Sequence, residues 1–143
     1  MKRLFVPDDP IKGLRILVVE DQLPQRTFIV DMLNSIGCRD VMTAGDGADA
    51  LSFLEEQGED VDVILCDWLM PRMSGIELLR KVRRTRPDLP FIMQTGNGTL
   101  DAVMEARREG VTAFVVKPFS CAQLEVKLRI ICRGRIRHLR PER

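Results

Sequence analysis

Strand-like and helix-like segments alternate five times along this chain, between residues 14 and 133. Each helix-like segment carries apolar residues at helical spacing, and each strand-like segment is short enough to form one strand of a sheet. Because parallel neighbouring strands need crossover helices, five such units predict a three-layer α/β fold with a five-stranded parallel sheet. The predicted strands lie at residues 14–19, 40–44, 61–66, 90–94 and 112–116.

The segment after the first predicted strand is clearly marked as a helix. Pro24 suits a first helical turn, and Gly37 suits the residue that ends the helix. The last helix has a start signal of its own, because Ser120 and Gln123 have the spacing of a capping box. In this segment the apolar residues Phe28, Ile29, Met32, Leu33 and Ile36 recur at helical spacing.

Size and composition fit one domain in the cytoplasm. The 143 residues are 45% hydrophobic and 30% charged, which suffices for a core and a hydrated surface. The formal net charge of +1 gives no overall field that would favour nucleic acid, and no apolar run approaches the length of a membrane span. We therefore expect no membrane or nucleic-acid partner, and a domain over residues 14–133 between an N-terminal extension (1–13) and a basic tail (134–143).

Cysteine and histidine chemistry is disfavoured by the spacing of these residues. The cysteines form no CxxC pair, and the single histidine, His138, lies in the basic tail. A zinc site or a disulfide framework is therefore not expected.

Polar side chains follow four of the five predicted strands. Glu20 and Asp21 follow the first strand, Asp67 ends the third, Thr95 ends the fourth, and Lys117 follows the fifth. Right-handed crossovers bring the carboxyl ends of parallel strands to one edge of the sheet, where ligands of such sheets bind. Any one of these residues alone is more often an ordinary turn or surface residue. Their joint occurrence predicts a functional site.

Three carboxylates at one edge repel one another unless a cation lies between them. Oxygen-only ligands with room for water favour Mg²⁺ over zinc or a full calcium cage, with Mn²⁺ able to substitute. A metal beside an aspartate, together with a lysine and a hydroxyl, is what phosphoryl transfer to a carboxylate requires.

Five motifs together carry a resemblance to a known family: ILVVEDQ, TAGDGADAL, VILCDWLMPRMSG, QTG and VVKPF. The chain resembles the receiver domains of two-component response regulators, and in size it is most similar to their stand-alone, chemotaxis-type members. The resemblance covers residues 14 to about 133. It implies a flavodoxin-like (βα)5 fold with the strand order 2-1-3-4-5.

The resemblance also implies roles for the residues at the sheet edge. Asp67 would be the phosphoacceptor, and Glu20, Asp21 and Asp67 would hold Mg²⁺ together with the backbone carbonyl of Leu69. Thr95 would bond a phosphoryl oxygen. Lys117 would pair first with Asp67 and then with the phosphoryl group.

The family also has a conformational switch, which the resemblance assigns to Thr95 and Phe114. Phe114 stands where chemotaxis-type members have a tyrosine, so switching here is expected to act by packing without a hydroxyl contact. The peptide bond between Lys117 and Pro118 is expected to be cis. Residues 96–98, Gly-Asn-Gly, are expected to make the loop after Thr95 loose.

The resemblance implies a phosphorylation-controlled switch with no enzymatic activity beyond its own phosphorylation and dephosphorylation. A sensor histidine kinase or a histidine phosphotransfer protein would be the donor. A downstream protein, or a second copy in a homodimer, would bind the surface of the fourth helix, fifth strand and fifth helix. Two alternatives stay open: a binding module that is never phosphorylated, and an aspartyl-phosphate phosphatase. Phosphatases of the haloacid-dehalogenase type need a second aspartate at the position of Leu69.

Overall fold

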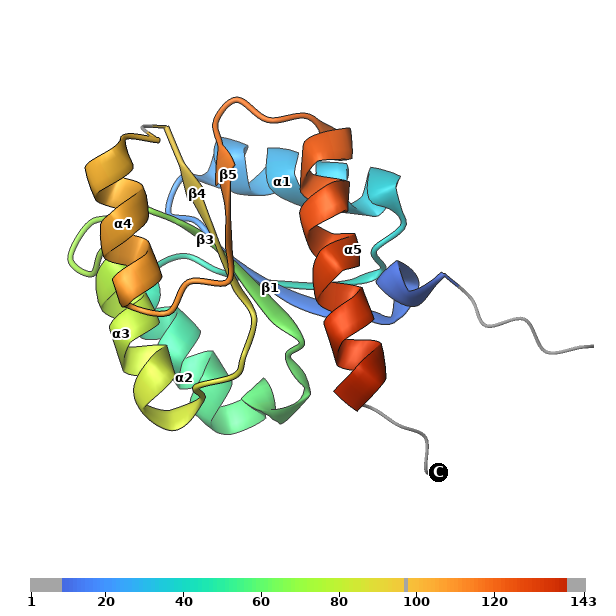
Figure 1. Cartoon of the computed structure of the whole chain (residues 1–143), viewed down its shortest axis with the longest axis horizontal. Helices are drawn as coiled ribbons and strands as arrows, with labels where there is room; N and C mark the ends of the chain where they lie inside the picture. Colours follow the sequence, from blue (N-terminus) through green and yellow to red (C-terminus); the bar gives the residue numbers. More distant parts are fainter. Residues whose placement is uncertain (1–8, 97, 139–143) are drawn as a thin grey trace, which may run out of the picture.

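The computed structural model describes residues 9–96 and 98–138 of the chain (Figure 1). A single five-stranded parallel sheet has the order β2-β1-β3-β4-β5, which confirms both the predicted fold class and the strand order. The strands are β1 (Arg15–Val19), β2 (Asp40–Ala44), β3 (Val63–Asp67), β4 (Phe91–Thr95) and β5 (Ala113–Val116). The helices are η1 (Pro10–Gly13), α1 (Leu23–Ile36), α2 (Gly47–Gln57), η2 (Gly58–Asp60), α3 (Gly75–Thr85), α4 (Leu100–Arg108) and α5 (Cys121–His138).

The helices form two layers, with α1 and α5 on one face of the sheet and α2, α3 and α4 on the other (Figure 1). Side chains alternate between the two faces along each strand. In β1, Ile16 and Val18 join the core under α1 and α5, whereas Leu17 and Val19 join the core under α2, α3 and α4. Because β1, β3 and β4 are covered on both faces, their side chains are almost all buried.

The helix boundaries largely follow the predicted signals. Pro24 lies in the first turn of α1, and Gly37 ends this helix in the left-handed conformation with φ of 115°. The backbone amide of Gln123 donates to the Ser120 hydroxyl, and the backbone amide of Ser120 donates to Gln123 Oε1, so the predicted capping box is present. Of the apolar residues at helical spacing in α1, Ile29, Met32 and Leu33 are buried, whereas the Phe28 side chain is 59% exposed.

Both ends of the described chain meet at α5. Ile11 of η1 is fully buried in the core under α1 and α5. Asp9 accepts two hydrogen bonds from Arg129 of α5, at 2.7 and 2.6 Å. Residues 9–13, expected as an extension, thus contribute to the core, and α5 continues to His138, beyond residue 133. Within the described ranges, no helix has the length and apolar content to cross a membrane.

Candidate functional site

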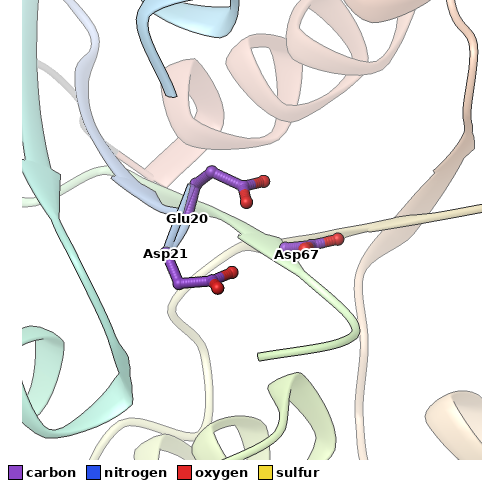
Figure 2. A group of neighbouring side chains, drawn as sticks. All are labelled: Glu20, Asp21 and Asp67. Carbon is purple, nitrogen blue, oxygen red and sulfur yellow. The ribbon is translucent and has the colours of Figure 1, made fainter. Parts of the chain in front are cut away.

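The three carboxylates expected at the sheet edge are brought together. Glu20 and Asp21 directly follow β1, and Asp67 is the last residue of the adjacent strand β3. Figure 2 shows their side chains pointing into one space at the carboxyl ends of these strands. One oxygen from each of the three lies within 4.8 Å of the others. The predicted gathering of acidic residues is therefore present.

Glu20 is the most deeply buried of the three acids. Its Oε2 accepts a hydrogen bond of 3.2 Å from the backbone amide of Gln22, whereas Oε1 accepts none from the residues that the structure describes. The nearest cation, Lys117 Nζ, lies 3.9 Å from Oε1, which is too long for a hydrogen bond. Burial, and then the charge of Asp67, raise the pKa of Glu20 to about 6. The site thus holds negative charge that its own residues do not fully compensate.

Asp67 has a closer cationic partner. Lys117 Nζ donates a hydrogen bond of 2.8 Å to Asp67 Oδ1, while no described residue donates to Oδ2. Lys117 lies just past β5, and its backbone amide donates to the carbonyl of Thr95 at the end of β4. The peptide bond from Lys117 to Pro118 is cis, as expected. Thr95 is buried at the same edge of the sheet. All five residues predicted from the strand ends therefore lie at one edge.

The loop after β3 is held tightly against the sheet. The backbone amide of Trp68 donates to the carbonyl of Gln94, and that of Gly75 donates to the carbonyl of Trp68. A β-carbon on Gly75 would lie 2.5 Å from the backbone oxygen of Asp67, so only glycine fits where the chain returns beneath the site. The Leu69 side chain is 76% exposed. The use of the Leu69 carbonyl as a metal ligand remains a prediction.

Two features of the site were not predicted. The ring of Phe114 stacks on Trp68, the neighbour of Asp67, with centroids 6.4 Å apart and planes inclined by 23°. Gln94 is fully buried beside Asp67, and no described residue bonds its amide. The sequence carried no signal for either, because both depend on which strands are neighbours. Asn97, of the loop expected to be loose, lies outside the described residues.

The residues fit a hard divalent cation. All three acidic side chains offer oxygen, and they lie close enough to share one ion. The buried Oε1 of Glu20 without a hydrogen bond is the kind of atom that a cation would satisfy. The donor set suits Mg²⁺ or Mn²⁺ better than zinc, because no cysteine or histidine belongs to this cluster.

Sequence comparisons relate this chain to known proteins. Residues 16–129 match the family model described as the response regulator receiver domain. The chain is 39% identical over 117 residues to a chemotaxis protein CheY homolog of Campylobacter jejuni, an alignment that covers 80% of this chain and 89% of that protein. It is 35% identical over 119 residues to chemotaxis protein CheY-3 of Vibrio cholerae, covering 82% and 90%.

Solved structures share the fold. A response regulator receiver domain protein from Clostridium thermocellum superposes with a TM-score of 0.82 at 27% identity, covering 88% of this chain and 99% of that one. The chemotaxis response regulator CheY4 of Vibrio cholerae gives 0.75 at 30% identity, covering 82% and 98%. The receiver domain of a Pseudomonas aeruginosa sensor histidine kinase, with a magnesium ion coordinated in its active-site cleft, gives 0.75 at 31% identity, covering 84% and 98%.

Proposed function

This chain belongs to the response regulator receiver domain family, and on that basis we propose that Asp67 accepts a phosphoryl group from a histidine kinase or phosphotransfer protein. The 2.8 Å hydrogen bond from Lys117 to Asp67 Oδ1 is the observation that carries this proposal. It holds the carboxylate in one orientation and leaves Oδ2 without a donor among the described residues. A carboxylate oxygen at the carboxyl end of a strand is the nucleophile that such a transfer needs.

The transfer exchanges one bond for another. An oxygen of Asp67 attacks phosphorus while the phosphorus–nitrogen bond of the donor phosphohistidine breaks, and the imidazole nitrogen keeps that electron pair. Lys117 then moves from the carboxylate to an oxygen of the phosphoryl group, and the Thr95 hydroxyl donates to another. The Lys117 ammonium and the Thr95 hydroxyl both act by stabilising negative charge on the oxygens of the phosphoryl group.

We assign the metal site to Glu20, Asp21, Asp67 and the Leu69 carbonyl. A bound Mg²⁺ would supply positive charge to the phosphoryl oxygens during transfer. The chain's own contribution is to hold three carboxylates within 4.8 Å of one another, which is unfavourable without a cation. The magnesium ion in the related Pseudomonas aeruginosa receiver domain supports this assignment.

We propose that Phe114 couples phosphorylation of Asp67 to the surface that binds a partner. Its ring stacks on Trp68, which follows Asp67 directly, so a change at the phosphoacceptor is transmitted to β5 through one aromatic contact. Movement of Thr95 toward the phosphoryl group would open space next to this ring. The neighbouring surface of α4, β5 and α5 exposes apolar side chains that a downstream protein or a second copy could cover, namely Leu100, Met104, Val116, Val126 and Ile130.

The test is phosphoryl labelling of Asp67→Asn with a phosphorylated kinase and with acetyl phosphate as a small donor. We expect complete loss of an acid-stable, hydroxylamine-sensitive label with the fold intact. Asp88→Asn, an exposed aspartate in the loop before β4, is the matched control and should label normally. Removal of divalent cations should block labelling of the unmodified protein. Full labelling of Asp67→Asn would overturn the assignment.

A further inference from the structure

A cavity lies on the face of the sheet covered by α1 and α5. Its volume is about 380 Å³, within the range of small-molecule sites. Phe28 of α1 and Pro118 and Phe119 of the loop between β5 and α5 line it. Gln94 of β4 and Lys117 also line it. Apart from Lys117, no lining residue named here has a part in the phosphoryl transfer proposed for Asp67.

The floor of the cavity carries an amide without partners. Gln94 is paired in register with Asp67, and its side chain lies on the same face as that of Ile92, which packs under α1 and α5. Gln94 is 0% exposed, yet neither Oε1 nor Nε2 has a hydrogen bond to any described residue. A buried amide that bonds to nothing is unfavourable, so its presence in an otherwise apolar strand points to a ligand.

The other lining residues restrict the chemistry of that ligand. Phe28 is 59% exposed at the mouth, and Pro118 and Phe119 add flat apolar surface against which a ring can pack. Lys117 is the charged residue of the lining, and its ammonium is already bonded to Asp67. The cavity therefore favours an uncharged ring with a polar edge.

We infer that this cavity binds a flat, uncharged ring that carries a carboxamide or lactam group, and that the buried Gln94 side chain turns toward the cavity to pair with this group through two hydrogen bonds. Such a group presents an N–H and a C=O side by side, and Gln94 presents the complementary acceptor and donor. Phe28 and Phe119 pack against the ring. Binding needs neither a phosphoryl group nor a metal, so it stands independently of the function proposed for Asp67.

The test uses benzamide as the probe and the unphosphorylated full chain labelled with ¹⁵N. We expect saturable shifts of the Gln94 side-chain NH₂ signals and of the backbone amides of Phe28 and Phe119. Methyl benzoate, which has the ring and the acceptor but no N–H, should bind about tenfold more weakly because one hydrogen bond is lost. Gln94→Met keeps the length and volume of the side chain and should weaken benzamide binding at least about tenfold.

Two controls separate this site from the rest of the molecule. Gln57→Met makes the same replacement at the exposed end of α2 and should leave benzamide binding unchanged. Added Mg²⁺ should also leave benzamide binding unchanged, which separates this cavity from the proposed metal site. Equal binding of benzamide and methyl benzoate, or of benzamide to Gln94→Met, would mean an apolar cleft without recognition and would overturn the inference. So would an absence of shifts up to the solubility limit of benzamide.

Discussion

Lys117 lies 2.8 Å from Asp67 Oδ1 and 3.9 Å from Glu20 Oε1, so one ammonium is shared unequally between two buried carboxylates. Lys117 bonds the carboxylate that is proposed to react and leaves Glu20 Oε1 without a hydrogen bond from any described residue.

Lys117→Met should slow phosphoryl labelling of Asp67 by about 100- to 1,000-fold, as removal of one charge-stabilising donor does in other active sites. Mg²⁺ binding should persist, because the three carboxylates remain. The measurement is the labelling rate with acetyl phosphate at saturating Mg²⁺. Lys81→Met, at an exposed lysine of α3 that pairs with no described carboxylate, should label at the normal rate. Comparable rates for both variants would contradict the role of Lys117.

Glu20 should make the metal-free protein less stable as the pH rises from about 4.5 to about 6. Its pKa is raised from 4.5 to about 6 in the folded chain, so the fold favours the protonated acid. This contribution is complete below pH 4.5, is lost as the pH passes 6, and amounts to at most about 2 kcal/mol. The measurement is the free energy of unfolding in urea with a chelator present.

Glu20→Gln provides the control for this pH effect, because glutamine stays neutral throughout. Between pH 4.5 and 6.5, the unfolding free energy of the unmodified protein should fall relative to that of Glu20→Gln. Added Mg²⁺ should raise the stability of the unmodified protein most above pH 6, where Glu20 is ionised. A difference that does not change with pH would show that Glu20 titrates normally.

Trp68 is the only tryptophan of the chain, so its fluorescence reports on the stack with Phe114. We expect its emission to change when acetyl phosphate and Mg²⁺ are added. In Phe114→Leu the phosphorylation-dependent part of this change should fall by more than half, while labelling of Asp67 persists. Phe53→Leu, at an aromatic residue of α2, is the control. An unchanged response in Phe114→Leu would separate Phe114 from the switch.

Leu69→Asn should speed the loss of the phosphoryl group several-fold. The Leu69 side chain stands two residues after Asp67 and is 76% exposed, where an apolar group can neither orient nor bond an attacking water. Leu100 is exposed to a similar extent, 73%, at the start of α4, so Leu100→Asn is a matched control. The measurement is the decay of labelled protein after removal of the donor. Equal rates of phosphoryl loss in Leu69→Asn and Leu100→Asn would contradict this role of Leu69.

Gln94→Met should raise the free energy of unfolding by about 1–2 kcal/mol, because it replaces a buried amide lacking partners by an apolar side chain of similar length. Gln57→Met should change it by less than about 0.5 kcal/mol, as exposed substitutions usually do. Urea unfolding of both variants gives the comparison. A loss of stability in Gln94→Met would show that the amide has a partner, such as a bound water, in solution.

The site was largely predictable because parallel topology fixes where each strand ends. Glu20, Asp67 and Lys117 stand immediately at or after strands, and any right-handed arrangement of those strands brings them to one edge. The capping box of Ser120 and Gln123 is local, so spacing alone identifies it. The predictions that held depend either on strand ends or on neighbours a few residues apart.

The features that were missed depend on registers between distant segments. Gln94 lies within an apolar strand, and only its pairing with Asp67 shows which face its amide meets. Phe28 has helical spacing with buried residues, but it lies at the edge of the apolar side of α1, next to a loop from the far end of the chain. The contact between Trp68 and Phe114 joins a loop to a strand two positions away in the sheet.

The ion pair between Asp9 and Arg129 joins residues 120 positions apart in the sequence. This separation has a consequence for folding during synthesis. On the ribosome, residues 9–11 are made well before α5, yet Ile11 lacks its full set of neighbours until α5 has emerged. Residues 9–11 precede the whole sheet in the sequence, yet they are therefore among the last parts of the fold to be fixed in place. A nascent chain that stalls before α5 leaves the apolar side chain of Ile11 open to contacts with other chains.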